Sequence, residues 1–235
     1  MVILGHRGAS GYAPENTLAA FRKGIEQNCD GFEIDVQLTK DNELVLFHDW
    51  SLGRSATGSG LIKDLNLDYI LKQDAGSWFA EEFKGEKIPT LKEFFDFVPK
   101  GMLINVEAKA KATDERDLGN RLVEEIIACD RVEDVIVSSF NHKTLNQIKD
   151  VSKDIKIGAL MYSRLIEMED YFLTKFPVYS AHLSEELTDR EMVTEIKSIG
   201  AKVYVWTVND KGTADQFKDM GVDGIITNYP DLYSK

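Results

Sequence analysis

Two acidic residues on one short β-rich segment carry the first chemical signal in this sequence. In residues 31–37 (GFEIDVQ), Glu33, Asp35 and Gln37 alternate with apolar residues. Side chains along a strand alternate between its two faces, so both carboxylates share one face and the apolar residues share the other. Adjacent carboxylates repel each other, which calls for a bound cation or a shared proton. The alternative is that both are solvated surface charges, but the apolar face would then have to meet water.

A second segment repeats this pattern at residues 103–109 (LINVEAK). Asn105, Glu107 and Lys109 alternate there with apolar residues. If the two segments are neighbouring strands, they bring Glu33, Asp35 and Glu107 to one site. Carboxylate oxygens of this kind suit Mg²⁺ or Ca²⁺ better than zinc. The alternative for the second segment is that Glu107 and Lys109 form only a structural ion pair.

Two histidines end β-rich runs of the same kind. His6 closes residues 2–6 (VILGH), and His48 closes residues 44–48 (LVLFH). Two imidazoles on either side of a scissile bond can serve as general base and general acid at neutral pH. Either histidine alone would more often be structural, but the pair beside three carboxylates favours catalysis. His142 and His182 have no such surroundings and are interpreted as structural or surface residues.

The elements that must position these groups follow an alternating pattern. Candidate strands begin near residues 2, 31, 102, 134, 155, 178, 202 and 222, with amphipathic helical stretches between them. Eight strands alternating with helices predict a parallel (β/α)8 TIM barrel, whose active sites lie at the C-terminal ends of the strands. The rival, an open doubly wound sheet, needs a glycine-rich phosphate turn after the first strand, and residues 6–11 (HRGASG) do not match it.

One interval between strands is much longer than the others. The second and third strands begin roughly 40 residues further apart than the even spacing of a barrel predicts. We therefore expect a single domain over residues 1–235, with an insertion at residues 50–88 that leaves the barrel after His48 and Asp49 and covers the active-site face.

Composition excludes several classes of protein. The chain has 235 residues, with 28 Lys and Arg against 40 Asp and Glu, and a net charge of −12. This balance argues against a nucleic-acid partner and against a polybasic membrane-surface protein. Cys29 and Cys129 are too few and too far apart for a disulfide framework or a zinc site. With no signal-peptide pattern and no apolar run near the ~20 residues of a membrane span, we expect a cytoplasmic protein without stable membrane insertion.

A set of short motifs resembles the bacterial, cytosolic type of the glycerophosphodiester phosphodiesterase family. In order, they are residues 6–8 (HRG), 14–17 (PENT), 33–35 (EID), 48–49 (HD), 107–109 (EAK), 138–140 (SSF), 206–209 (WTVN) and 221–227 (GVDGIIT). The resemblance implies a (β/α)8 barrel with an insertion after the second strand. It also implies divalent-metal-dependent hydrolysis of small glycerophosphodiesters, such as glycerophosphocholine or glycerophosphoethanolamine, to glycerol 3-phosphate and an alcohol.

The resemblance also implies roles for individual residues. The metal ligands would be Glu33, Asp35 and Glu107, the acid–base pair His6 and His48, and the phosphate ligands Arg7 and Lys109. Glu15 would orient Arg7 or assist the metal, and Trp206 would form an apolar wall against the glycerol. The sequence departs from the family pattern at residues 52–58 (LGRSATG) and at Asn228, which puts details of the insertion and the substrate rim in doubt.

The expected mechanism uses the substrate itself. The 2-hydroxyl of the glycerol moiety attacks phosphorus, with His6 as the favoured base and His48 as the favoured acid, and water then opens the cyclic phosphate. One alternative is a lysophospholipase D-like enzyme, for which Trp78, Phe79 and Phe83 would supply an apolar groove. An alternative of another class is a non-catalytic barrel that binds a phosphorylated ligand, which would typically lack one of the histidines or carboxylates.

Overall fold

Eight parallel strands close into a barrel in the computed structural model, which describes residues 1–114 and 116–233. The strands are β1 (Val2–His6), β2 (Gly31–Leu38), β4 (Leu103–Ala108), β5 (Val135–Ser139), β6 (Lys156–Met161), β7 (Ser180–Ser184), β8 (Lys202–Trp206) and β9 (Gly224–Thr227). Each pairs with its neighbours in the order β1-β9-β8-β7-β6-β5-β4-β2, and β1 also pairs with β2. The predicted (β/α)8 barrel is thereby confirmed. The predicted domain limits extend over residues 115 and 234–235, which lie outside the described residues.

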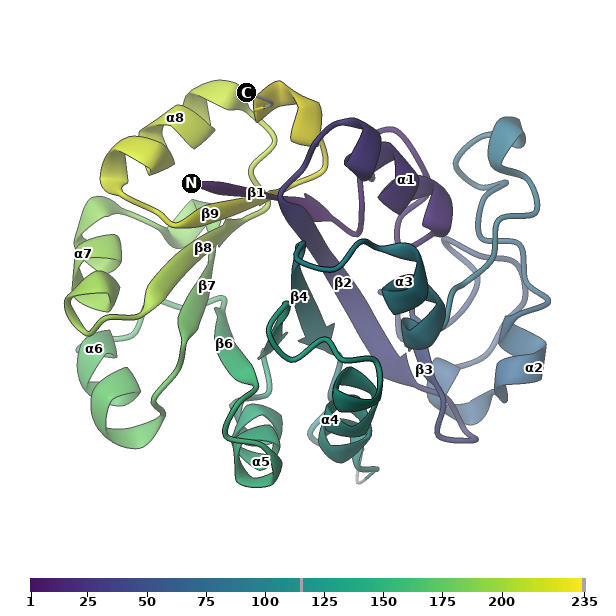
Figure 1. The fold of residues 1–235 in the computed structure, drawn as a ribbon, viewed down its shortest axis with the longest axis horizontal. Coiled ribbons are helices and arrows are strands. Elements are labelled where there is room, and N and C mark those ends of the chain that lie inside the picture. The colour runs from purple at the N-terminus through teal and green to yellow at the C-terminus, as the bar shows by residue number, and fades with distance from the viewer. Residues whose placement is uncertain (115, 234–235) are drawn as a thin grey trace.

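Helices follow the strands on the outside of the barrel (Figure 1). They are α1 (Leu18–Glu26), α3 (Leu91–Phe97), α4 (Leu118–Ala128), α5 (His142–Val151), α6 (Met168–Asp170), α7 (Arg190–Ser198) and α8 (Lys211–Met220), with a π turn at Tyr171–Lys175 and 3-10 turns at Glu185–Leu187 and Pro230–Tyr233. Each of the longer helices turns an apolar stripe inward, as Leu118, Leu122 and Ile126 do on α4. Among the described residues, no helix is long and apolar enough to cross a membrane.

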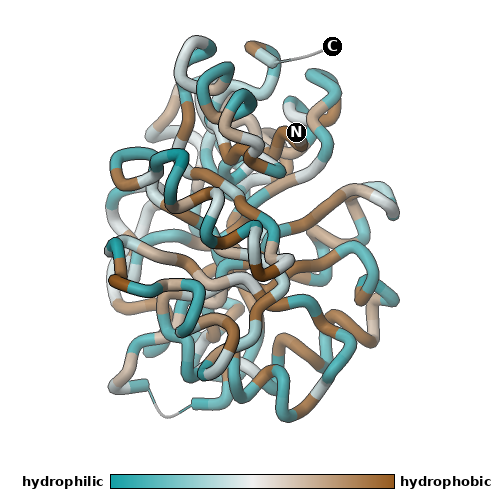
Figure 2. The backbone as a smooth tube through the Cα atoms, turned by 90° about the vertical axis from the view of Figure 1, so that its left-hand side faces the viewer, coloured by the Kyte–Doolittle hydropathy of each residue, from teal (hydrophilic) through white to brown (hydrophobic). Residues whose placement is uncertain are grey.

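The main core lies between the barrel and these helices. Phe32, Ile34 and Val36 on the outward face of β2 are fully buried, and Phe21 and Phe94 pack edge-on against each other beside them. Apolar stretches run through the interior of the molecule, while hydrophilic ones gather at the outer turns (Figure 2). Because this side of β2 is committed to the core, its alternate residues Glu33 and Asp35 must point into the barrel.

A smaller apolar cluster fills the part of the barrel interior nearer the N-terminal ends of the strands. Leu4, Ile136, Tyr204 and Ile226 pack together there. In the register of β1 with β2, Leu4 lies opposite Gly31, and His6 lies opposite Glu33. The polar residues of β1 and β2 therefore occupy the layers above this cluster, toward the C-terminal ends of the strands.

The run that ends at His48 contains the short strand β3 (Leu44–Leu46), which was not among the eight strands predicted for the barrel. It runs antiparallel to β2 and lies outside the closed barrel, so His48 does not end a barrel strand. A hairpin instead brings the chain back from the end of β2, and the Phe47 backbone N–H donates to the Asp35 carbonyl at 3.0 Å. His48 therefore still comes close to the carboxylates, but by a different route.

Residues 50–88 form a lobe beside β3, drawn in blue in Figure 1. They contain α2 (Leu67–Ile70) and short 3-10 turns at Ile62–Asp64 and Glu81–Phe83. The lobe has its own small core, in which Ile62, Ile70 and Ile88 pack with Val45 and Phe47 of the β3 hairpin. The insertion is therefore anchored to the same hairpin that carries His48.

Candidate active site

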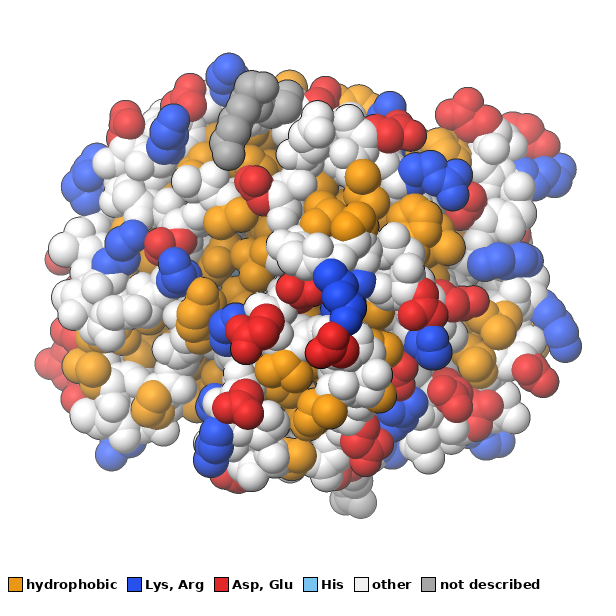
Figure 3. All heavy atoms as spheres, viewed as in Figure 1, with side chains coloured by type: hydrophobic (Ala, Val, Ile, Leu, Met, Phe, Trp, Pro, Cys, Tyr) orange, Lys and Arg blue, Asp and Glu red, His pale blue; other side chains and the backbone are white. Residues whose placement is uncertain are grey.

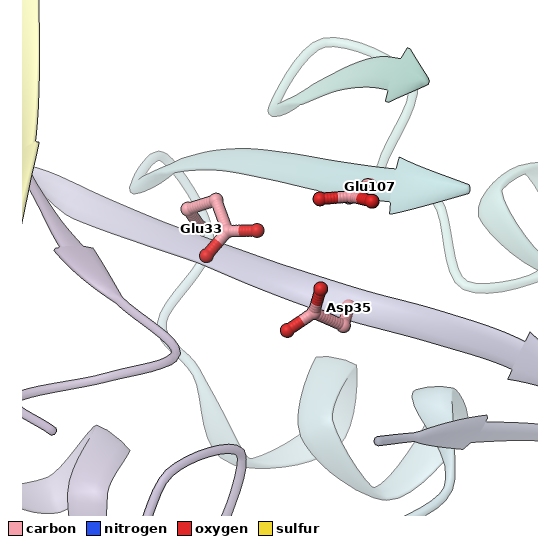
Figure 4. Close-up of side chains that lie close together, drawn as sticks. All are labelled: Glu33, Asp35 and Glu107. Atoms are coloured by element: carbon pink, nitrogen blue, oxygen red, sulfur yellow. The ribbon is translucent and has the colours of Figure 1, made fainter. Parts of the chain in front are cut away.

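Three carboxylates converge inside the C-terminal end of the barrel. Glu33 and Asp35 project from β2, and Glu107 projects from β4, where it is the direct partner of Asp35 across the sheet. One oxygen from each lies within 4.8 Å of the others. Figure 4 shows the three side chains close together on the two strands. Glu33 is 5% exposed and Asp35 is 1% exposed. The alternative that Glu33 and Asp35 are solvated surface charges is thereby excluded.

Burial and mutual repulsion shift the pKa values of these acids. Burial, followed by the charge of Asp35, raises the pKa of Glu33 well above its usual range and raises that of Glu107 to about 7. For Asp35, burial acts in the same direction, but the Arg7 guanidinium and the Lys109 ammonium hold its pKa below its usual value. The positive charge of the neighbouring groups is therefore too small to keep both glutamates ionised at neutral pH.

This donor set fits a divalent cation. All three groups supply hard oxygen atoms, which Mg²⁺ and Ca²⁺ prefer. Asp35 Oδ1 is buried and has no hydrogen-bond partner among the described residues. A cation between the carboxylates would satisfy that oxygen and would also relieve the repulsion between the acids.

Two cationic side chains lie against the same cluster. Arg7 Nε is 3.1 Å from Asp35 Oδ2, and the Arg7 guanidinium also donates to Glu15 Oε1 at 3.2 Å. Lys109 Nζ is 3.2 Å from Glu107 Oε1 and 3.5 Å from Asp35 Oδ1. The ion pair between Glu107 and Lys109 therefore exists, but it is part of a larger cluster of charges and is not an isolated structural contact.

The backbone at Arg7 is held in an unusual conformation. Its φ of 56° lies in the left-handed region, which side chains other than glycine adopt rarely. The Arg7 N–H donates to the Glu33 carbonyl at 2.8 Å, and the Arg7 carbonyl accepts from Asn16 N–H at 2.9 Å. These bonds offset the local strain and aim the guanidinium at Asp35.

His6 is set up to act as a neutral imidazole. Its Nδ1 is 2.6 Å from Asn228 Oδ1, an atom that can only accept a hydrogen bond, so Nδ1 carries the proton. Nε2 then carries the lone pair and lies 3.9 Å from Glu33 Oε2, facing the carboxylate cluster. Burial, followed by the charge of Arg7, lowers the pKa of His6 to about 4. His6 is therefore unprotonated at neutral pH.

His48 has a different partner. Its Nδ1 is 2.8 Å from Asp49 Oδ1. The hydrogen bond from Arg54 keeps the pKa of Asp49 below its usual value, although burial opposes this shift. Arg54 also donates to Glu15 Oε1 at 2.6 Å. A carboxylate on Nδ1 fixes the orientation of the imidazole ring and leaves Nε2 as the nitrogen that a substrate can contact.

Trp206 lies across the barrel mouth from β4, at the end of β8. Its indole N–H donates to the His182 carbonyl at 3.1 Å. Its ring meets the rings of Phe140 and Tyr162 at centroid distances of 5.7 and 6.0 Å. These three residues, which lie at the C-terminal ends of β5, β6 and β8, form an aromatic surface at the barrel mouth.

The other two histidines make structural contacts. His182 is fully buried in β7, with its Nε2 2.9 Å from Ser180 Oγ. His142 Nε2 donates to the Leu160 carbonyl at 3.1 Å, and its ring stacks on Phe176. Neither histidine contacts the carboxylate cluster.

Sequence reasoning missed the residues that orient the site. Asn16 donates to Asp35 Oδ2 at 2.9 Å, Asn228 holds His6, and Asp49 with Arg54 holds His48. Asn16 and Asp49 stood within quoted motifs, while Arg54 and Asn228 stood where the sequence departs from the family pattern. No periodicity connects Asn228 to His6 or Arg54 to Glu15, because these pairs are brought together only by the closed barrel.

Comparison with known proteins places this geometry in context. The model of the glycerophosphoryl diester phosphodiesterase family matches residues 6–232. A glycerophosphodiester phosphodiesterase of Caldanaerobacter subterraneus is 40% identical over 231 residues, which cover 98% of this chain and 95% of the relative. A human lysophospholipase D is 25% identical, covering 97% of this chain and 83% of the relative.

The solved structures agree with the sequence relatives. A phosphodiesterase of Oleispira antarctica, in complex with the product sn-glycerol 3-phosphate, is 32% identical with a TM-score of 0.85, covering 98% of this chain and 94% of that one. Both the sequence match over nearly the whole chain and the shared barrel lead to one conclusion. This protein belongs to the glycerophosphoryl diester phosphodiesterase family.

Proposed function

We propose that this protein hydrolyses small glycerophosphodiesters to glycerol 3-phosphate and an alcohol, in a reaction that depends on Mg²⁺ or Ca²⁺. The observation that carries this proposal is the opposite hydrogen bonding of the two histidines beside the carboxylate cluster. His6 donates from Nδ1 to a neutral amide, whereas His48 is bonded to an ionised carboxylate. One imidazole is therefore suited to accept a proton and the other to donate one.

Glu33, Asp35 and Glu107 would hold the metal ion. When bound, the ion supplies positive charge to the phosphoryl oxygens. Arg7 and Lys109 contact the same carboxylates and would bind the remaining phosphoryl oxygens through charge-assisted hydrogen bonds. Glu15 bonds to both Arg7 and Arg54, so its role would be to fix the Arg7 guanidinium.

The first chemical step would be an attack within the substrate. His6 Nε2 removes the proton from the glycerol 2-hydroxyl, and the oxygen forms a bond to phosphorus. The bond from phosphorus to the head-group oxygen breaks, and His48 Nε2 gives that oxygen its proton. The products of this step are the free alcohol and a cyclic phosphate, with His6 protonated and His48 neutral.

Water opens the cyclic phosphate with the two roles exchanged. His48 now accepts a proton from water as its oxygen bonds to phosphorus, and His6 returns a proton to the 2-oxygen. Glycerol 3-phosphate leaves, and both histidines are back in their starting forms. In this scheme Trp206 would be the wall against which the apolar face of the glycerol packs.

The proposal makes the reaction sensitive to metal removal. Release of choline from glycerophosphocholine should stop after chelation and return on addition of Mg²⁺ or Ca²⁺. Full activity in a sample shown by elemental analysis to be metal-free would refute the metal dependence. Absence of hydrolysis with any added divalent ion would instead favour the barrel that only binds a phosphorylated ligand.

The insertion would help to select the head group. Arg54 belongs to this segment and bonds to Asp49, the partner of His48, and Trp78 lies 5.8 Å from the Arg54 guanidinium. Replacing Trp78 with alanine should change the order of preference among substrates more than turnover on the smallest one. An unchanged order would show that this part of the insertion is only structural.

A lysophospholipase D activity is the second candidate. The apolar surface near the site is the aromatic set of Trp206, Phe140 and Tyr162, of which Phe140 is 50% and Tyr162 59% exposed. An acyl chain could lie against this surface instead of the groove expected from Trp78, Phe79 and Phe83 in the insertion. Substrate profiling against glycerophosphocholine and lysophosphatidylcholine separates the two activities.

A further inference from the structure

A pocket of about 350 Å³ opens beside the carboxylate cluster. It is bounded by the ends of β2 and β4, by the N-termini of α4 and α5, and by the first part of the insertion. Lys63, Lys109, Lys111 and Lys143 line it together with Trp50. We refer to it as the lysine pocket.

The positive charge of this pocket contrasts with the rest of the molecule. The chain carries a net charge of −12, and on the face shown in Figure 3 acidic and basic side chains are interspersed. Within the described residues, Lys63, Lys111 and Lys143 have no carboxylate within 4.0 Å, unlike Lys109, which contacts the carboxylate cluster. Three lysine side chains are thus left to attract an anion.

Both acids that line the pocket among the described residues already have partners. Asp114 pairs with Arg116 at 2.7 Å. Asp117 caps α4 by accepting from the Asn120 backbone N–H at 3.1 Å. The N-cap residue of α5, Asn141, makes no capping hydrogen bond with its side chain. The N-terminal backbone N–H groups of α5 therefore add to the positive potential of the lysines.

The lysine pocket is continuous with the candidate active site. Lys109 lines the pocket and also contacts Glu107 and Asp35. The Trp50 ring lies under both Lys109 and Lys111, with ammonium-to-centroid distances of 5.5 and 4.4 Å. Gln37, which follows Glu33 and Asp35 on the inward face of β2, lines the pocket too. A substrate with its phosphodiester at the carboxylate cluster can therefore extend past Trp50 into the pocket.

We propose that the lysine pocket binds an anionic group on the leaving alcohol, so that the preferred substrates are glycerophosphodiesters whose head group carries a further phosphate or carboxylate. This inference rests on the proposed function and adds a substrate class to it. Positive charge around the head group attracts such substrates and disfavours cationic ones such as glycerophosphocholine, so it acts on selectivity. Trp50 is already covered by two ammonium groups, which makes it a poor cage for a quaternary ammonium.

The test compares two substrates that differ in one group. They are glycerophosphoglycerol and the same diester with a phosphate on its distal glycerol. The wild-type protein should show a kcat/KM about tenfold higher for the phosphorylated diester, the effect of a few partly exposed ion pairs. In the double variant Lys111→Gln and Lys143→Gln, this ratio should fall to about two. The preference should also weaken as salt is raised.

A matched control keeps the comparison specific. Lys153 lies just beyond the opposite end of α5, is largely exposed, and its ammonium is 3.9 Å from Asp150 Oδ1. Lys153→Gln removes the same charge and should leave the ratio unchanged. If the wild-type protein hydrolyses both diesters but the ratio is near one, or the double variant keeps the wild-type ratio, the lysine pocket inference is overturned while the proposed function stands. If no glycerophosphodiester is hydrolysed, the proposed function fails and the inference fails with it.

Discussion

Replacing His48 with alanine tests the assignment of acid and base most directly. With burial lowering the pKa of His6 to about 4, only about one His6 in a thousand is protonated at pH 7. His6 therefore cannot substitute for a missing acid, and the loss should lie near 10³-fold, within the usual range for general acid–base groups. This corresponds to about 4 kcal/mol of activation free energy. Because His48 is not in the carboxylate cluster, metal and substrate affinity should change little.

The leaving group separates the two histidines. Turnover is measured for His6→Ala and His48→Ala on glycerophosphocholine and on the p-nitrophenyl diester of glycerol 3-phosphate, whose leaving group needs no protonation. The p-nitrophenyl substrate should restore turnover in His48→Ala and not in His6→Ala, since only His6 would activate the 2-hydroxyl. Binding of Mg²⁺ or Ca²⁺, measured by calorimetry, serves as the control for an intact site.

Two results would refute this reasoning. Restoration in His6→Ala alone would reverse the roles of the two histidines. Near-normal turnover of both variants on glycerophosphocholine would remove the histidine mechanism altogether.

Three further predictions follow from the same structure. Glu107→Gln should weaken the binding of Mg²⁺ or Ca²⁺, measured by calorimetry, at least tenfold. The substitution removes a buried charge, so the thermal midpoint of unfolding should not fall. A variant that fails to fold would make Glu107 a structural residue. A metal ion binds the ionised carboxylate, so with the pKa of Glu107 at about 7 the metal affinity should rise about tenfold from pH 6 to pH 8, and a flat profile would contradict the burial of this acid. Phe94→Ala, which empties a fully buried position, should cost about 3–5 kcal/mol in the free energy of unfolding measured with urea, and a loss below 1 kcal/mol would argue against the packing of Phe94 on Phe21.

Much of the fold could be predicted because it depends on local patterns. The alternation in residues 31–37 is a property of any strand with one buried face, so Glu33 and Asp35 had to share the other face. The spacing of the strands similarly indicated eight repeats and one insertion. The position of the run ending at His48 could not be predicted in the same way, since a periodicity of two cannot distinguish a barrel strand from the returning arm of a hairpin.

The candidate site was only partly predictable. Glu33, Asp35 and Glu107 could be proposed because they lie within recognisable β-rich runs, and His6 and His48 because they end such runs. Asn228 could not, because its contact with His6 spans 222 positions along the chain and arises only when β9 closes the barrel beside β1. Arg54 lies in the insertion, where the chain has little regular structure and no periodicity to read.

The sequence alone allowed us to predict which residue types share a face, which elements repeat, and that three carboxylates and two histidines are candidates for a site of metal-assisted hydrolysis. The tertiary structure decided the charge state of that chemistry. Burial inside the barrel raises the pKa of Glu107 and lowers that of His6. At Asp49, burial acts in the raising direction too, but the hydrogen bonds from Arg54 and His48 hold its pKa below the usual value. These differences depend on solvent exclusion and on distances between atoms from different elements. Such quantities exist only in the folded chain, so two histidines that look alike in the sequence acquire different partners and different surroundings.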